Sequence, residues 1–431
     1  MGHERTFKKA IVGLLGCGNI GGGVYHLLED FQQDMALRYG LDIQVKRILV
    51  KEIASVPHSD IPRQLLTEDP ADVLMDPEIE LVAEFIGGEQ PAASFMQKAL
   101  EQGKTVVTAN KVALASHWQA LHDAAEKSGA GLYYEASVCG AVPVINVLHN
   151  SLQASRIQQV MGIINGTTNY ILSNMAKEKS TYQEELARAQ QLGLAEPDPY
   201  MDVEALDAAF KLSILSTLCF FQHIPYTQVY REGITDISPE DIAFGQEMGY
   251  VLKLLGIAQL NKEAGKVEVR VHPTFLPSHH PLAKVDGALN GVFLYGDACK
   301  EVMLQGHGAG DRPTAGAVVS DMIRALTQPD SGANHRFHRE DPPMEIERNW
   351  LTRYFIRMDV ADAPGTLAVI GSVLGDAGVS IASISQRGKS HNGFVPVALV
   401  THQVREQVMQ EALKKLPPEI CAVKSAIRVE E

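Results

Sequence analysis

An acidic segment that ends in a lysine carries the clearest pattern for chemistry. Residues 193–211 read GLAEPDPYMDVEALDAAFK and place five carboxylates before Lys211. Asp207 and Lys211 are four residues apart, so both would lie on one face of a helix. Residues 212–221 are mostly apolar, and a lysine beside a buried stretch needs a charged partner. We therefore interpret the pair as a candidate functional pair. The alternative is an exposed Asp–Lys pair at an acidic helix start.

A glycine-rich loop near the start predicts a nucleotide site. The apolar run 10–15 leads directly into GCGNIG at 16–21, and residues 21–28 have helical spacing. This is G-x-G-x-x-G in the strand–turn–helix context that dinucleotide binding requires. Phosphates would bind the free N–H groups of the helix start. The alternative is an accidental glycine turn. The expected cofactor-binding residues here are Gly16, Gly18, Asn19, Ile20 and Gly21.

Two further lysines could contact the cofactor. Lys51 follows the second predicted strand and would favour the 2′-phosphate of NADP, but Glu52 beside it would suit the ribose hydroxyl of NAD. The sequence slightly favours NADP and leaves both open. Lys111, in the sequence TANK, follows the predicted strand 105–108 at the edge where such sheets bind ligands. Both lysines could equally be ordinary surface residues.

Two other polar loops could line a ligand pocket or be structural turns. One is GIINGTTNY at 162–170, which contains Gly166 and Thr167. The other is GHGAGDRPT at 306–314, where Gly310 precedes a predicted helix. His279 and His280 have no third ligand nearby in the sequence, so we do not predict a metal there.

Composition narrows the class of protein. The 431 residues suggest about three domains. With 38 Lys and Arg against 52 Asp and Glu, the net charge is −14, which argues against binding to nucleic acid or anionic membranes. No apolar stretch is long enough for a membrane span. The five cysteines are scattered without a C-x-x-C, which predicts a reducing, cytoplasmic location.

Strand and helix patterns predict an α/β protein. Residues 8–145 alternate between the two, as in a Rossmann-like doubly wound sheet. We expect its strands at 10–15, 43–50, 81–86, 105–108 and 131–136. Residues 146–305 suggest an α+β unit with helices at 203–221 and 239–255 and strands at 267–271, 291–295 and 301–305. We expect a linker at 331–349 and a small domain at 350–431.

Six motifs, in order, closely resemble the homoserine dehydrogenase family. They are GLLGCGNIGGGV at 13–24, TANK at 108–111, YEASVCGAVPVI at 134–145, GIINGTTNYIL at 162–172, GLAEPDPYMDVEALDAAFKL at 193–212 and GHGAGDRPTAGAVVSDMI at 306–323. The resemblance implies reversible, NAD(P)H-dependent reduction of L-aspartate 4-semialdehyde to L-homoserine, in threonine, methionine and isoleucine biosynthesis. It also implies that residues 306–323 rejoin the nucleotide domain. The nucleotide domain would then consist of residues 1–145 and 306–330, and the substrate-binding, catalytic and dimerisation domain of residues 146–305.

The resemblance also implies roles for individual residues. Lys211 would be the acid–base residue, and Lys111 a second cation near nicotinamide and substrate. Substrate contacts would come from Glu196, Asp202, Asp207, Gly166 and Thr167, with Glu196 and Asp207 on the ammonium group. A monovalent cation, sodium or potassium, would lie at Glu135 and the carbonyls of Val138, Gly140 and Val142. Leu194 and Ala205 depart from the family, which usually has an aromatic residue and a glycine there.

Residues 350–431 resemble a ferredoxin-like ACT domain. Residues 354–360 read as a strand, 361–367 as a turn that opens a helix, and 378–384 as a second strand. This implies an amino-acid effector, most plausibly L-threonine, near Asp362, Gly365 and Thr366. A purely structural dimerisation unit is the alternative, and we expect a homodimer or homotetramer. For the whole chain, the rival interpretations are another Rossmann-fold semialdehyde or amino-acid oxidoreductase and a non-catalytic nucleotide and amino-acid sensor.

Overall fold

The chain forms two compact units, each built from several chain segments. The structure is a computed structural model that describes residues 7–261, 264–328, 344–386 and 390–430. The first unit contains residues 1–158, 210–227 and 294–343, and the second contains the remaining segments, 159–209, 228–293 and 344–431. Within the described residues, no helix is long and apolar enough to cross a membrane.

The first unit contains a six-stranded parallel sheet of order β3-β2-β1-β4-β5-β6. The strand order reverses beside β1, as in doubly wound folds, so the Rossmann-like prediction is confirmed. The strands are β1 (Lys8–Leu15), β2 (Leu41–Leu49), β3 (Leu66–Thr67), β4 (Leu81–Glu84), β5 (Thr105–Thr108) and β6 (Leu132–Tyr133). The helices between them include α1 (Asn19–Asp30), α2 (Gln32–Tyr39), α4 (Ala92–Glu101), α5 (Lys111–Ser116) and α6 (Trp118–Ser128).

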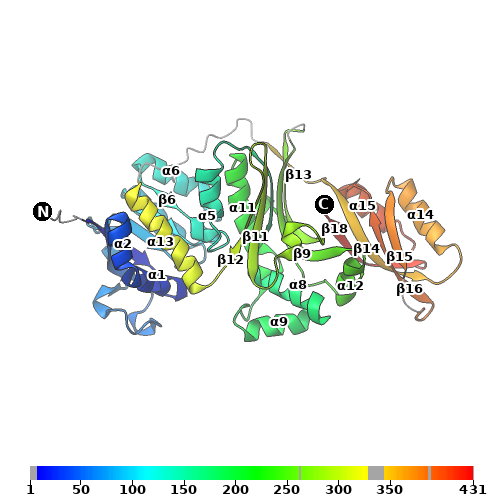
Figure 1. The fold of residues 1–431 in the computed structure, drawn as a ribbon, viewed down its shortest axis with the longest axis horizontal. Helices are drawn as coiled ribbons and strands as arrows, with labels where there is room; N and C mark the ends of the chain where they lie inside the picture. The colour runs from blue at the N-terminus through cyan, green and yellow to red at the C-terminus, as the bar shows by residue number, and fades with distance from the viewer. Residues whose placement is uncertain (1–6, 262–263, 329–343, 387–389, 431) are drawn as a thin grey trace. The chain divides into compact units, whose positions relative to one another are not determined.

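Helix α13 (Asp311–Thr327) packs beside α1 although it lies almost 300 residues later in the sequence (Figure 1). A Cβ atom on Gly23 of α1 would lie 3.5 Å from the Asp311 carbonyl oxygen, so the two helices approach closely. The buried face of α13, including Val318 and Met322, joins the core cluster of β1 and α1. Chain segments distant in sequence therefore share one hydrophobic core.

A half-buried histidine makes the stability of this unit sensitive to acid. His122 of α6 stacks on Trp118 at 4.1 Å between ring centroids, and burial lowers its pKa to about 4. An unfolded chain would bind a proton at this residue below about pH 6.5, whereas the folded chain would not. We therefore expect the free energy of unfolding to fall by about 3 kcal/mol between pH 7 and pH 4 from this residue. Denaturant titrations of wild type and His122→Asn at several pH values across that range would measure this loss. An equal dependence of the free energy of unfolding on pH in both proteins would contradict the prediction.

The second unit contains a mixed sheet whose strands follow the order β7-β9-β10-β18-β14-β16-β15. Its long central pair is the antiparallel hairpin of β9 (Tyr250–Asn261) and β10 (Lys266–Pro277), and β10 in turn pairs with β18 (Cys421–Val429). The other strands are β7 (Ile157–Ile163), β14 (Leu351–Ala361), β15 (Ile381–Gln386) and β16 (Phe394–Thr401). The prediction of a mixed substrate domain and a ferredoxin-like module is confirmed.

The helix predicted at 239–255 is wrong in its second half. Helix α12 (Pro239–Glu247) begins with a capping box at Ser238 and ends before Gly249, whose φ is +88°. The following residues form β9, which is buried along most of its length. A continuous apolar run such as YVLKLL does not distinguish a buried helix from a buried strand. Hydrogen bonding of these residues to β10 makes them a strand.

The helix predicted at 203–221 is interrupted. Helix α10 (Tyr200–Val203) stops, and α11 (Leu206–Phe220) starts after Ala205, whose φ is +60°. A left-handed backbone is costly for any residue with a Cβ atom and free of that cost for glycine. The glycine usual in the family would fit this turn without strain.

Two smaller predictions also change. The strand expected at 131–136 shortens to β6 and is followed by a 3₁₀ turn at Glu135–Ser137. Most of the predicted linker 331–349 lies outside the described residues. Its last part forms the short strand β13 (Glu345–Glu347), which pairs with β10.

A buried ionic cluster joins β18 to its neighbours in the second unit. The Arg428 guanidinium donates to Glu232 at 2.6 Å and to Glu406 at 2.7 Å, and it lies over the rings of Tyr230, Trp350 and Tyr354. Only 2% of Arg428 is exposed. Since an arginine is buried only when its charge is compensated, these carboxylates and rings fix β18 in the sheet.

Candidate active site

The glycine loop has the shape that a pyrophosphate needs. Gly16 has a φ of +106°, and a Cβ atom on Gly21 would lie 2.2 Å from the Gly16 carbonyl oxygen, so neither position admits a side chain. At Gly18 a Cβ atom would meet nothing within 4 Å, so the backbone is open there. No side chain caps the start of α1 at Gly18. The first N–H groups of α1, from Asn19 and Ile20 onward, therefore fit a bound phosphate.

The position that would distinguish NAD from NADP stays ambiguous. Lys51 and Glu52 are both exposed in the segment that follows β2. A cation and an anion are thus equally available to the ribose of a bound dinucleotide. Gly310, which starts α13 with a φ of +115°, also lacks a side-chain cap.

Lys111 is the first residue of α5, directly after β5. Asn110 caps this helix: its Oδ1 accepts from the Ala113 N–H at 3.0 Å, and its Nδ2 donates to the Gly88 carbonyl at 2.8 Å. Lys111 therefore begins a helix whose capping residue is also bonded to the segment at Gly88.

Glu84, at the end of β4, supports the same loop and was not predicted. Its carboxylate accepts from the Thr108 hydroxyl at 2.7 Å, from the Ile86 N–H at 2.7 Å and from Asn110 Nδ2 at 3.3 Å. Burial raises the pKa of Glu84. A carboxylate inside the apolar run 81–86 was the available signal, because such a group is buried only for a reason.

On the substrate side, Asn165 brings together two of the predicted carboxylates. It caps α8 (Gly166–Glu178) by accepting from the Thr168 N–H at 2.9 Å. Its Nδ2 donates to Asp202 at 2.7 Å and to Asp207 at 2.8 Å. The start of α8 and both acids therefore form one hydrogen-bonded polar group within the second unit, in which Asp207 is buried and Asp202 is partly exposed. Asn165 lies in the predicted polar loop 162–170 but was not predicted as a site residue.

The neighbouring predicted residues lie around this group. The Thr167 hydroxyl donates to the Leu194 carbonyl at 2.7 Å, and a Cβ atom on Gly166 would lie 2.7 Å from the Ala288 carbonyl oxygen. Glu196 is exposed on the turn after α9 (Tyr182–Gln191) and lies outside the hydrogen bonds of Asn165. Leu194 is 37% exposed.

Lys211 lies one helical turn after Asp207 on α11. Asp207 is 4% exposed and Lys211 is half-buried. The spacing places both side chains on the same face of this helix. Because Asn165 fixes Asp207, the helix presents a lysine next to an oriented carboxylate.

The predicted cation residues surround a buried carboxylate. The Glu135 carboxylate accepts from the N–H groups of Ile145 at 3.0 Å and Asn146 at 2.6 Å, and its own N–H donates to Asp321 at 2.9 Å. Burial and the charge of Asp321 raise the pKa of Glu135 to about 8. Two buried carboxyl groups near enough to affect each other's charge would be stabilised by a nearby cation, so this donor set fits a monovalent ion.

The backbone between the other cation candidates is tightly turned. Cys139 has a φ of +59° and Gly140 one of +51°, and a Cβ atom on Gly140 would lie 2.7 Å from the Gly308 carbonyl oxygen. The carbonyl of Val142 accepts from the Val144 N–H at 2.8 Å. The carbonyl groups of Val138, Gly140 and Val142 thus lie on a turn that touches the 306–310 loop.

The ACT-like module contains a cavity of about 290 Å³. Among its lining residues are all three predicted effector contacts: Asp362, Gly365 and Thr366. Gly365 has a φ of +91° and starts α14 (Thr366–Asp376). A helix start beside a carboxylate suits the two charged groups of a free amino acid.

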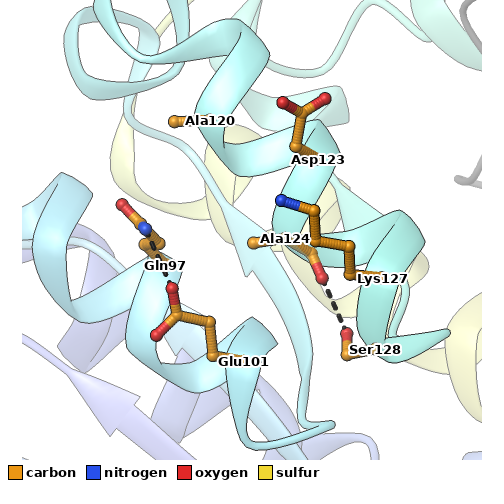
Figure 2. A pocket seen from close by; sticks show the side chains of 7 residues that line it. All are labelled: Gln97, Glu101, Ala120, Asp123, Ala124, Lys127 and Ser128. Atoms are coloured by element: carbon orange, nitrogen blue, oxygen red, sulfur yellow. Dashed lines mark hydrogen bonds between the residues drawn. The ribbon is translucent and has the colours of Figure 1, made fainter.

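A second cavity, of about 370 Å³, lies between α4 and α6 of the first unit and was not predicted (Figure 2). Figure 2 shows that Gln97 bonds to Glu101 across its α4 side, while Lys127 and Asp123 come from α6. None of the residues predicted to be catalytic lines this cavity. It therefore lies outside the candidate active site.

Comparison with known proteins identifies the family. Residues 143–323 match the family described as homoserine dehydrogenase, and residues 16–135 match the homoserine dehydrogenase NAD-binding domain. Homoserine dehydrogenase from Bacillus subtilis is 40% identical over 98% of this chain and 99% of its own. The chain belongs to the homoserine dehydrogenase family. Its members are NAD(P)-dependent oxidoreductases, so the chain is an enzyme of that class rather than a silent sensor.

Solved structures and the remaining family match agree with this. A homoserine dehydrogenase from Thiobacillus denitrificans superposes with a TM-score of 0.89 at 36% identity, over 99% of each chain. One from S. aureus has a TM-score of 0.78 at 31% identity, over 98% of this chain and 99% of its own. Residues 354–418 match the ACT domain, which confirms the predicted module.

Proposed function

We propose that the chain catalyses the reversible reduction of L-aspartate 4-semialdehyde to L-homoserine. The observation that carries this proposal is the Asn165 group, which fixes Asp207 one turn before Lys211 on α11. Family membership supplies the substrate, and this group supplies residues suited to it. Glu196 and Asp207 would bind the ammonium group, with Asp202 held beside them. Gly166 and Thr167, at the start of α8, would contact the substrate.

The positive charge of Lys211 would stabilise the reacting oxygen of the substrate. A bound dinucleotide supplies the hydride for reduction and accepts it in the reverse direction. As the aldehyde oxygen gains negative charge, the Lys211 ammonium stabilises it and then donates a proton to it. A neighbouring carboxylate keeps this lysine charged. In homoserine oxidation Lys211 must accept the proton. Lys111 adds a second positive charge near the cofactor.

The dinucleotide would bind at the glycine loop, with Gly310 and Lys111 close to it. We infer a slight preference for NADP, supported by the exposed Lys51 directly after β2. We also infer a sodium or potassium ion at Glu135 and the carbonyls of Val138, Gly140 and Val142, supported by the buried carboxyl pair.

One assay tests both the reaction and the ion. Absorbance of reduced cofactor would be followed with homoserine and either NAD or NADP, in potassium, sodium or choline chloride at equal ionic strength. We expect activity with homoserine, higher with NADP, and higher in potassium or sodium than in choline. No activity with either cofactor would refute the proposed reaction. Equal rates in all three salts would refute the ion.

We further propose that L-threonine binds the ACT cavity and inhibits the enzyme. Asp362 would bind the ammonium group, while Gly365 and Thr366 at the start of α14 would bind the carboxylate. Truncation before the module is an unsuitable test, because β18 pairs directly with β10 and its loss would expose that strand. A point variant avoids this problem.

For Asp362→Ala, we expect the threonine concentration for half-inhibition to rise at least about tenfold, because a charge-assisted hydrogen bond to ammonium is lost. The uninhibited kcat should stay the same. Asp376→Ala, at the exposed end of α14, is the matched control and should respond to threonine as wild type does. Equal inhibition of all three proteins would rule out this binding mode.

The assembly and location are also proposals. We expect a homodimer or homotetramer, which light scattering of the purified protein would distinguish. None of the five cysteines, which are Cys17, Cys139, Cys219, Cys299 and Cys421, forms a disulfide bond. Reduced thiols support the proposed cytoplasmic location.

A further inference from the structure

Three potential metal ligands meet on the outer side of α1. His26 lies on α1 itself, and His58 and Asp60 lie on the segment between β2 and β3. One potential ligand atom from each side chain lies within 4.8 Å of the others. His26 Nε2 is 2.7 Å from an Asp60 oxygen, and the two histidine rings meet edge to face at 5.3 Å between centroids. Two imidazoles and one carboxylate are a donor set that zinc and similar ions accept.

The position of His58 supplies an independent observation. Its Nε2 lies 3.1 Å from the Gly18 carbonyl oxygen. A carbonyl oxygen only accepts, so Nε2 carries the hydrogen and Nδ1 of the neutral ring keeps its lone pair. Metal-binding histidines characteristically donate their other N–H to a carbonyl or carboxylate in this way. The contact with Gly18 thus fixes both the tautomer and the direction of the ring.

Gly22 provides room for this histidine. A Cβ atom at Gly22 would lie 2.0 Å from His58 Nε2, so any other residue here would displace the ring. The dinucleotide fingerprint accounts for Gly16, Gly18 and Gly21 but places no demand on the next residue. Close approach of His58 to the helix backbone gives Gly22 a structural reason.

Asp60 is the third potential metal ligand. It is exposed, so its carboxylate is open to solvent, and one of its oxygens lies 2.7 Å from His26 Nε2.

We propose that His26, His58 and Asp60 form a binding site for a divalent transition metal ion of the zinc class. Water would complete the coordination, because all three residues are at least partly exposed. The ion would join the segment after β2 to α1. It would take no part in hydride transfer, and the site is separate from the monovalent-cation candidates at Glu135.

Cobalt(II) is a suitable probe because it occupies zinc sites and absorbs visible light. We expect the full chain to bind one Co²⁺ through this site, with absorption bands that Zn²⁺ abolishes. His26→Asn and His58→Asn should each weaken binding at least about tenfold. His402→Asn, an exposed histidine elsewhere in the chain, is the matched control and should bind as wild type.

Gly22→Ala tests the geometry without removing a ligand, and it should also weaken Co²⁺ binding at least about tenfold. Circular dichroism would establish that each variant is folded. Absence of Co²⁺ binding by wild type at millimolar concentration would overturn the proposal. Equal Co²⁺ binding by wild type, His26→Asn and His58→Asn would also overturn the proposal. His26 and Asp60 would then be an ordinary histidine–aspartate pair.

Discussion

Replacement of Lys211 by alanine should lower kcat for homoserine oxidation by about 10²–10⁴-fold, the usual contribution of a positioned acid–base group. The variant should still bind NADPH, because the glycine loop and the start of α1 are unchanged. Stopped assays for product and fluorescence titration of NADPH would measure the two effects separately. Lys177→Ala, on the exposed end of α8, is the matched control and should keep full activity.

The pH profile gives this prediction a second readout. Homoserine oxidation by wild type should speed up from neutral to mildly alkaline pH, because Lys211 must be able to accept a proton. The residual activity of Lys211→Ala should lack that rise. Near-normal turnover in this variant, or a flat wild-type profile, would remove Lys211 from the proton transfer and with it the proposed mechanism.

Replacement of Arg428 by alanine should lower the free energy of unfolding of the second unit by about 3–5 kcal/mol, because it leaves the buried Glu406 carboxylate without its cation. Arg428 bonds to Glu232 and Glu406 and is nearly inaccessible to solvent. Urea titration followed by circular dichroism would measure the loss. Threonine inhibition of any folded variant should weaken as well, since β18 joins the ACT-like module to β10.

Lys424→Ala is the control for this experiment. Lys424 lies on the same strand and forms an ion pair with Asp359, but its side chain is 43% exposed. Exposed pairs contribute about 0–1 kcal/mol. A loss of the same size in both variants would show that disturbance of β18, rather than its buried charge, causes the change.

Much of the first unit could be predicted because its signals are local. The apolar run before Gly16 and the glycine spacing depend on the immediate backbone, so they indicate the strand, turn and helix without knowledge of distant contacts. The same reasoning gave the wrong secondary structure for residues 250–255. Their apolar pattern fits a buried helix and a buried strand equally, and only pairing with β10 separates the two.

The residues of the candidate site also fall into those that local spacing predicts and those that depend on distant contacts. Asp207 and Lys211 could be paired from the sequence, because their spacing defines a helix face. Asn165 and Glu84 could not be given roles, because each acts on residues far along the chain: Asn165 on Asp202 and Asp207, and Glu84 on Thr108 and Asn110. A sequence shows that a buried polar residue needs partners but does not name them.

The place of β18 in the sheet has a consequence for biosynthesis on the ribosome. This strand lies between β10 and β14 but follows both in the chain. Until it emerges, β14 and the end of β10 at Thr274 and Phe275 each lack a partner on one edge, and such edges are prone to pair with other chains. A nascent chain must therefore keep its C-terminal sheet open until the last strand is made. A premature stop within residues 421–429 would disrupt the whole sheet as well as the regulatory module.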